Sequence, residues 1–323
     1  MKRIICIIIA LLIVCTFFIV FRKDNENKKI TVSEVTHSVF YTPWYVALEN
    51  GYFKSSGLDI EVILTPGADK VASSVLSGDA QIGFSGPEAT VYVYNNSTEK
   101  LISFASLTKR DGQFIVGPCK LKDKFKMTNL INKTVLAGRS GGMPLLMFKY
   151  ALKESNIDEK LVNIDTSVDF SSLSGAFIGK QGEFVNLFEP TANKIEKEKY
   201  GCVLSSLGKI SGVVPYTTFY AKEKFISENA NIIKKFNQAL NKGIRFVKEN
   251  DEITIANSIK NQFNDLEFDD LVTVIKRYKD ADSWYNSTYI NIDDYNRLLD
   301  IMMYGKVIDE KVDINLLVTN EYN

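Results

Sequence analysis

The chain has 323 residues, of which 45% are hydrophobic, and its 39 basic and 39 acidic side chains give a formal net charge of zero. That length is enough for one large or two medium domains, each with its own hydrophobic core. A chain without net charge has no long-range field to attract nucleic-acid phosphates, so we expect no nucleic-acid partner.

The first predicted element is an apolar N-terminal segment. Lys2 and Arg3 precede residues 4–21, which carry no charged side chain. This run is longer than the apolar core of an ordinary secretory signal, about 7–15 residues, and reaches the ~18 residues of a membrane-spanning helix. We therefore expect residues 1–23 to be a signal or anchor helix and the rest to lie at the cell membrane, on its extracytoplasmic face. An uncleaved anchor is favoured over a cleaved or Cys15-lipidated form, because Val14 is not a small residue.

Residues 24–29 are polar and form the expected tether, after which short apolar strands alternate with helices. Strands are expected at 30–38, 58–65, 80–86 and 101–107, and helices at 43–53, 68–78 and 87–95. Proline in the first turn of a helix and glycine at its end are typical of helix boundaries. This alternation predicts a mostly parallel sheet covered by helices.

A second series of the same kind follows. Strands are expected at 134–141, 161–167, 184–189 and 202–207, with helices at 143–155, 172–181 and 191–200. From Lys222 onward nearly all of the chain has helical periodicity. The sequence therefore predicts an α/β protein with two sheets and a helical C-terminal part.

Two β-prone stretches, near 111–117 and 212–219, are the expected crossings between the two units, and they could run side by side. This divides the chain into a first lobe at 30–111, a second lobe at 112–214, and a return to the first lobe at 215–323.

Ligands of open α/β sheets bind beyond the carboxyl ends of the strands. Applied to this chain, the rule selects the loops after the first, third and later strands. The ligand-binding candidates are His37, Tyr41, Trp44, Ser85, Gly86, Arg139, Ser140, Gly141, Gly142, Phe188, Glu189 and Tyr216.

The chemistry of these side chains indicates the kind of ligand. Tyr41 and Trp44 either form an aromatic wall on which a ligand ring can stack, which we call the stacking wall, or only pack the start of their helix against the core. Ser140 and the two glycines after it precede a helix whose N–H groups suit an anion or carbonyl oxygen, or are a plain helix cap. Arg139 suits an anion and Glu189 an amine or amidine. Together they favour a zwitterionic or heteroaromatic solute over a simple anion.

The residues also argue against metal and common catalytic chemistry. His37 is the only histidine, and is either a ligand donor or a satisfied loop residue, the second being favoured. With Cys119 and Cys202 as the only cysteines after the apolar run, a zinc or iron site lacks ligands. We expect no metal, no cofactor and no catalytic residues. The two cysteines can form a disulfide or remain buried thiols, and thiols are favoured.

Several segments resemble a known family. They are "YTPWYVA" at 41–47, "ENGYF" at 49–53, "GLDIE" at 57–61 and "LSGDAQIG" at 76–83, joined by Phe188-Glu189-Pro190. They resemble ABC-transporter substrate-binding proteins of the branch that handles nitrate, taurine, aliphatic sulfonates and thiamine precursors. The resemblance runs from about Thr31 to about Tyr304.

The resemblance implies a bilobal type II periplasmic-binding-protein fold that clamps a small organic solute between its lobes. It also implies an ABC permease and its ATPase as partners, a monomer, and no enzymatic activity. Two alternatives share the fold: a membrane-anchored ligand-sensing domain, and an enzyme similar to a pyrimidine-precursor synthase.

Overall fold

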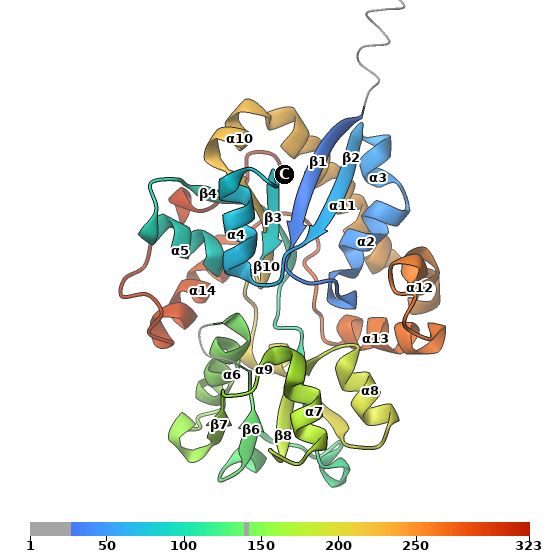
Figure 1. Cartoon of the computed structure of the whole chain (residues 1–323), viewed down its shortest axis with the longest axis vertical. Helices are drawn as coiled ribbons and strands as arrows, with labels where there is room; N and C mark the ends of the chain where they lie inside the picture. The colour runs from blue at the N-terminus through green and yellow to red at the C-terminus, as the bar shows by residue number, and fades with distance from the viewer. Residues whose placement is uncertain (1–26, 139–141) are drawn as a thin grey trace, which may run out of the picture.

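The computed structural model describes residues 27–138 and 142–323, which form two α/β lobes (Figure 1). The predicted signal or anchor helix at 1–23, and most of the tether, lie outside the described residues. Across 27–138 and 142–323, no helix is both long enough and apolar enough to cross a membrane.

Lobe 1, at the top of Figure 1, is built on a five-stranded sheet of order β2-β1-β3-β10-β4. Its strands are β1 (Lys28–Glu34), β2 (Leu58–Leu64), β3 (Ile82–Ser85), β4 (Leu101–Thr108) and β10 (Thr217–Lys222). β1 runs parallel to β2 and β3, while β10 is antiparallel to β3 and β4. The carboxyl ends of β1, β2, β3 and β4 therefore meet at one edge of the sheet, which faces lobe 2.

Lobe 2 is built on a second five-stranded sheet of order β7-β6-β8-β5-β9. Its strands are β5 (Gln113–Gly117), β6 (Thr134–Leu136), β7 (Asn163–Asp165), β8 (Phe184–Phe188) and β9 (Cys202–Ser206). β6 is parallel to β7 and β8, and β5 is antiparallel to β8 and β9. Together the two lobes confirm the predicted bilobal α/β fold.

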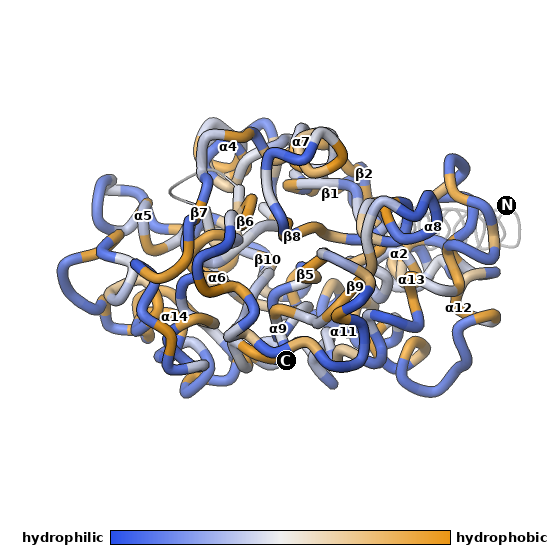
Figure 2. The backbone as a smooth tube through the Cα atoms, turned by 90° about the horizontal axis from the view of Figure 1, so that it is seen from below, coloured by the Kyte–Doolittle hydropathy of each residue, from blue (hydrophilic) through white to orange (hydrophobic). Residues whose placement is uncertain are grey.

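Helices cover both faces of each sheet. Those of lobe 1 and the C-terminal part are α2 (Thr42–Glu49), α3 (Tyr52–Ser55), α4 (Ala68–Ser77), α5 (Glu88–Asn96), α10 (Glu223–Glu228), α11 (Ala230–Glu249), α12 (Glu252–Ile259), α13 (Phe268–Asp280) and α14 (Ile292–Tyr304). Those of lobe 2 are α6 (Met143–Glu154), α7 (Leu173–Ile178), α8 (Thr191–Lys197) and α9 (Leu207–Ser211). In the view from below, β6, β8, β5 and β9 lie between α7 on one side and α6 and α9 on the other (Figure 2).

Short 3-10 turns complete the fold. They are η1 (Val39–Tyr41), η2 (Cys119–Leu121), η3 (Met127–Leu130), η4 (Glu159–Leu161), η5 (Phe170–Ser172), η6 (Lys260–Gln262) and η7 (Ile314–Leu316). The single helix expected at 43–53 is broken, because Gly51 adopts a φ of 68°, in the left-handed region that glycine tolerates.

The chain passes between the sheets through residues 109–112, after β4, and returns through 212–216, before β10. The two connecting segments do touch, because the Val214 N–H donates to the Lys109 carbonyl at 3.0 Å, but the strands that follow them do not run side by side. Residues 113–117 form β5, which pairs with β8 and β9, whereas β10 pairs with β3 and β4 in the other sheet. We keep 30–111, 112–214 and 215–323 as the proposed lobe boundaries.

Two further findings depart from the sequence-based expectations. Cys119 and Cys202 form a disulfide with a Cα–Cα distance of 4.8 Å, so they are not buried thiols. The bond ties the turn after β5 to the start of β9, within lobe 2. The C-terminal part contacts both lobes, because α13 packs on η1 of lobe 1 and on α8 of lobe 2, and α14 packs on α6.

Candidate functional site

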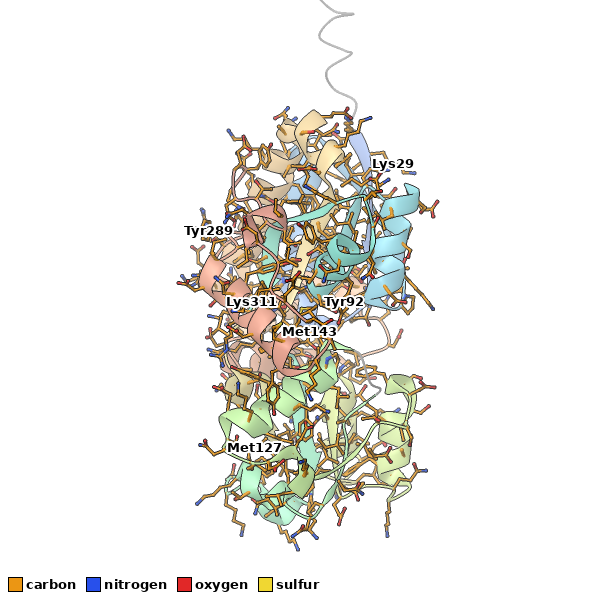
Figure 3. The ribbon with its side chains drawn as sticks, turned by 90° about the vertical axis from the view of Figure 1, so that its left-hand side faces the viewer. Lys29, Tyr92, Met127, Met143, Tyr289 and Lys311 are labelled. Atoms are coloured by element: carbon orange, nitrogen blue, oxygen red, sulfur yellow. A yellow bond between two sulfur atoms is a disulfide. The ribbon has the colours of Figure 1, made fainter. Side chains whose placement is uncertain are left out.

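The strand ends that carry most candidate residues face each other across the junction of the lobes. On the lobe 1 side are the loops after β1, β3 and β4, and on the lobe 2 side those after β6, β7 and β8 (Figure 1). Met143, the first residue of α6, lies close to this junction, while Met127 lies far down lobe 2 (Figure 3). We call this junction the cleft.

Aromatic rings line the cleft and form what we call the aromatic seam: Phe40, Tyr41, Phe170, Phe188, Tyr216 and Tyr278. The Phe40 ring lies 5.8 Å from Phe188, 5.9 Å from Tyr216 and 5.0 Å from Tyr278 between centroids, so it joins lobe 1 to lobe 2. Gly112 lies beneath the first contact, where a Cβ would come within 2.8 Å of the Phe40 ring and 2.9 Å of the Phe188 ring. Only glycine leaves room for these two rings to meet.

Most of the seam is buried, but one ring is accessible. Phe170, in η5 after β7, is 46% exposed and lies 5.6 Å from the Phe188 ring. Tyr41 and Tyr216, both predicted from the sequence, are buried in the seam. The Tyr41 ring packs on Phe84 at 4.4 Å. Phe170 is therefore the most accessible ring of the seam.

Trp44 does not form a stacking wall. Its side chain is 0% exposed, and the rings of Phe53, Phe84, Phe219 and Phe236 surround it. Its Nε1–H donates to the buried carboxylate of Glu34 at 2.9 Å. Trp44 thus belongs to the core of lobe 1, which sequence periodicity alone could not decide.

His37 is a satisfied loop residue. Its Nε2–H donates to the Gln262 carbonyl at 2.8 Å, and its ring packs between Tyr45 and Phe263. The Glu34 carboxylate, 3.5 Å from Nδ1, raises the pKa of His37 above its ordinary value. All of these contacts lie within lobe 1 and the C-terminal helices.

The raised pKa of His37 predicts a pH-dependent contribution to stability. A protonated His37 stabilises the folded state fully below the unfolded pKa of about 6.5, and this contribution is lost as the pH rises through the folded pKa. The unfolding free energy that His37→Gln removes should therefore be larger at pH 5.5 than at pH 8.0 in denaturant titrations. Because His37 is the only histidine, equal losses at the two pH values would contradict this assignment.

Ser85 and Gly86 lie at the carboxyl end of β3. The Ser85 hydroxyl shares a 2.8 Å hydrogen bond with the Tyr220 hydroxyl, so it is engaged inside lobe 1. Gly86 has the Glu88 carboxylate directly against its Cα, with no room for a Cβ. The glycine therefore allows the acidic side chain of Glu88 to fold back over the strand end.

Glu189 has an internal partner. Its carboxylate is fully buried, pairs with Arg277 of α13 at 2.6 Å and accepts from the Asn193 backbone N–H at 2.7 Å. Arg277 also contacts Glu196. Burial raises the pKa of Glu189 above its ordinary value, although Arg277 opposes that shift. The carboxylate expected to receive an amine is thus occupied by a bridge between α8 and α13.

The helix start predicted to bind an anion is described only from Gly142 onward; Arg139, Ser140 and Gly141 lie outside the described residues. Gly142 precedes α6 and provides no side-chain cap, and Pro144 follows in the first turn. The first N–H groups of a helix have no partner within the helix. The N–H groups at the start of α6 are therefore suited to donate hydrogen bonds to an oxygen atom of a solute.

Four polar residues near the cleft are not among the predicted candidates: Glu88, Asp111, Gln113 and Asn186. Each has a buried side-chain oxygen or nitrogen without a hydrogen-bond partner in the described part of the chain. The strand-end rule reaches Glu88, which follows β3 at the start of α5, but not Gln113, which begins β5. Arg277 and Tyr278 lie in the helical C-terminal part, where the sequence carries no signal for a role in the cleft.

Two hollows of the surface lie elsewhere. One, of about 490 Å³, is lined by residues such as Lys28, Gly57 and Ser227 near the amino ends of β1 and β2. The other, of about 350 Å³, lies beside Phe125 and Ser205 on lobe 2. Neither is at the carboxyl ends of the strands, where α/β sheets bind their ligands, so we place the site in the cleft.

Comparisons with known proteins agree with this geometry. The NMT1/THI5-like family profile matches residues 39–253. The YtlA protein of Bacillus subtilis (strain 168) is 36% identical over 302 residues, covering 93% of this chain and 90% of YtlA.

Solved structures show the same fold. The alkanesulfonate-binding protein SsuA from Xanthomonas axonopodis pv. citri, bound to MOPS, aligns with a TM-score of 0.70 at 11% identity, over 91% of this chain and 99% of SsuA. The nitrate-binding protein NrtA from Synechocystis PCC 6803 aligns with a TM-score of 0.68 at 13% identity, over 92% of this chain and 87% of NrtA.

Proposed function

Because this chain belongs to the NMT1/THI5-like family, we propose that it is an extracytoplasmic solute-binding protein of an ABC importer. In this role it clamps a small organic solute in the cleft and delivers it to a permease driven by an ATPase. The observation that carries the proposal is the aromatic seam, which joins facing strand ends of two separately folded sheets.

The fold suggests how the solute is held. Two short segments, 109–112 and 212–216, connect the lobes, so the lobes can hinge about them. A solute stabilises the closed arrangement only through contacts that it makes with both lobes at once. Tyr41 and Gly86 are available from lobe 1, and Gly142, Phe170 and Phe188 from lobe 2. Most of these rings are buried where the lobes meet, so the solute would enter when the lobes move apart.

The proposed solute is an organic molecule with a flat or apolar part rather than a bare inorganic anion. Aromatic faces bind heteroaromatic rings and alkyl groups, and the N–H groups at the start of α6 can donate to an oxygen of the solute. Of the solutes bound within the wider group, the organic ones, namely sulfonates, taurine and thiamine precursors, remain candidates, whereas nitrate is disfavoured. Membrane anchoring through residues 1–23 and the monomeric state are parts of the same proposal.

The test is mass spectrometry of small molecules released from the purified protein comprising residues 27–323, combined with small-angle scattering. We expect a released organic solute, and a smaller radius of gyration when that solute is added back to the stripped protein. Recovery of a chemically altered product would instead favour the enzyme alternative. A radius that does not change with any recovered solute would count against the clamp.

Phe170 provides a direct test of the cleft. Since its ring is exposed at the edge of the seam, Phe170→Ala should weaken binding of the recovered solute by about 1–2 kcal/mol without changing stability. Ile178→Ala is the matched control, because Ile178 is an exposed apolar residue at the end of α7. Calorimetric titration measures both variants, and equal affinities for them would place the solute elsewhere.

A further inference from the structure

Two acidic side chains at the cleft have no counter-charge among residues 27–138 and 142–323. Glu88, the first residue of α5, is 6% exposed, and Asp111, in the first connecting segment, is 1% exposed. Oδ1 of Asp111 accepts from the Gln113 backbone N–H at 2.6 Å, whereas its Oδ2 and Oε2 of Glu88 have no partner within 27–138 and 142–323. Neither carboxyl forms an ion pair with any described residue.

Two described arginines, Arg110 beside Asp111 in the sequence and Arg277 beside the seam residue Tyr278, pair with other acids. Arg110, next to Asp111, pairs with Asp282 and reaches the Gly208 carbonyl. Arg277 pairs with Glu189 and Glu196. The titratable groups that face Glu88 are Tyr41, Tyr92, Tyr216, Tyr220 and Tyr295, and those that face Asp111 are Tyr216 and Tyr278. The pKa of each of these tyrosines is raised, so they stay neutral and supply no counter-charge. Burial has the largest effect on the pKa of Asp111 and raises it, whereas hydrogen bonding from Tyr216 lowers it.

Both acids lie next to residues of the lobe junction. The Glu88 carboxylate lies against Gly86 after β3, and Asp111 precedes Gly112, which lies against the Phe40 and Phe188 rings. Both carboxyls also raise the pKa of Tyr216, whose ring belongs to the aromatic seam. Glu88 comes from lobe 1 and Asp111 from the connection to lobe 2. The two acids therefore approach the seam from different parts of the hinged molecule.

Gln113 provides an independent sign of a missing ligand. It is fully buried, yet both its Nε2 and its Oε1 are without a partner in the described structure. In β5 it stands directly opposite Phe188, so both side chains lie on the same face of the sheet, at the edge where the seam begins. Asn186, two positions before Phe188 on the same face, is also buried with both side-chain polar atoms unpartnered.

Such groups are expensive to keep in a folded protein. A buried amide or hydroxyl without a hydrogen bond costs about 1–3 kcal/mol, and a buried carboxylate without a cation costs more unless it takes up a proton. Burial raises the pKa of Glu88 to about 7 and that of Asp111 to about 8. Packing alone gives no reason to place two acids and two amides together at the cleft, whereas a bound solute does.

We propose that Glu88 and Asp111 recognise a positively charged nitrogen of the solute, so that the cleft takes an organic cation such as an amine or an amidinium. The charged nitrogen lies between the two carboxyls and against the faces of Tyr41 and Tyr216, which attract cations through their ring electrons. Gln113 and Asn186 bind the polar remainder of the solute. This inference rests on the proposed solute-binding function and names its substrate class.

Binding of a cation to these two acids should release protons to the solvent. Near pH 7 the ligand-free protein holds a proton on Asp111 and partly on Glu88, and a bound cation expels it. Affinity for a permanently charged amidinium should therefore rise with pH between 6 and 8, by up to about tenfold per pH unit for each proton released. Titrations in buffers of different ionisation enthalpy measure the released proton directly.

The experiment uses three probes of nearly equal shape: benzamidine, a cation; benzamide, neutral; and benzoate, an anion. We expect benzamidine to bind at least tenfold more tightly than the other two and to release a proton. Glu88→Gln and Asp111→Asn should each weaken benzamidine at least tenfold and reduce proton release, with benzamide unaffected. Glu61→Gln, on exposed β2, is the control and should change nothing.

A second measurement needs no ligand. Because the folded protein holds these protons more tightly than the unfolded chain, its unfolding free energy should fall as the pH rises from about 4 to about 8. Glu88→Gln and Asp111→Asn should flatten this fall and raise stability at pH 8. Unchanged pH profiles in both variants would overturn the inference.

Tighter binding of benzoate or benzamide than of benzamidine would also overturn the inference. So would unchanged benzamidine affinity in both variants. If an anionic probe binds and reduces the radius of gyration, the proposed solute-binding function stands and only the cation class fails.

Discussion

Replacing Arg277 with alanine is expected to lower the unfolding free energy by about 3 kcal/mol at pH 7, within the 3–5 kcal/mol range for breaking a buried ion pair. The reason is the position of Glu189, whose side chain is fully buried and whose carboxylate would lose its only cation among the described residues. Arg277 also contacts Glu196, which keeps Lys122 as a partner in the variant. Denaturant titration followed by circular dichroism measures the loss.

The pH dependence identifies the cause of this loss. The pKa of Glu189 is already raised by burial, and removal of Arg277 raises it further, so Glu189 can take up a proton in the variant. A protonated Glu189 needs no cation, and the destabilisation should therefore shrink as the pH falls toward 4.5 and grow as it rises toward 8. The combined Glu189→Gln/Arg277→Ala variant should recover part of the stability.

Lys276→Ala is the matched control for Arg277→Ala. Lys276 is the preceding residue of α13 and pairs with Asp280 on the exposed surface. Its removal should change the unfolding free energy by less than about 0.5 kcal/mol, as for most exposed ion pairs. A loss below about 1 kcal/mol for Arg277→Ala would show that Glu189 does not depend on the bridge between α8 and α13.

Replacing Trp44 with alanine should also destabilise the protein strongly, by about 3–5 kcal/mol, the usual effect of removing a large buried aromatic side chain. Four phenylalanine rings surround its fully buried side chain, so the variant would contain a cavity that they fill only partly. The variant would also leave Glu34 with only Tyr45 and His37 as side-chain partners.

Trp44→Phe separates stability from binding. It keeps most of the ring volume but removes the Nε1–H that Glu34 accepts, so we expect a loss of about 1–2 kcal/mol. Affinity for the recovered solute should be unchanged, because Trp44 faces the core of lobe 1. Weaker binding by Trp44→Phe at unchanged stability would instead show that the Trp44 ring contacts the solute.

Tyr289→Ala is the control for the Trp44 variants. Tyr289 is 51% exposed and lies on the outer side of lobe 1 (Figure 3), so its truncation should stay within about 0.5 kcal/mol. If Tyr289→Ala and Trp44→Ala lowered the unfolding free energy by similar amounts, burial would not explain the destabilisation by Trp44→Ala.

The sequence by itself determined the architecture, because the signals for strands, helices and turns are local. Alternating apolar runs located all four strands of the first series to within a few residues, and Pro43 and Gly78 marked helix boundaries that the structure confirms. A glycine needed at positive φ, or a proline in a first helical turn, depends on a few neighbouring bonds and can be read without the fold. The family could be named for the same reason, from short contiguous motifs.

Only the tertiary structure decided which side chains have partners within the protein and which are left to bind a solute. Glu189 finds its partner 88 positions later in Arg277, Cys119 meets Cys202 across 83 positions, and Trp44 is enclosed by rings from β3, β10 and α11. Such pairings depend on how distant elements pack, and residue type and spacing do not specify them. The same packing leaves Glu88 and Asp111 buried without a counter-charge from the described part of the chain, a property that exists only after the chain has folded.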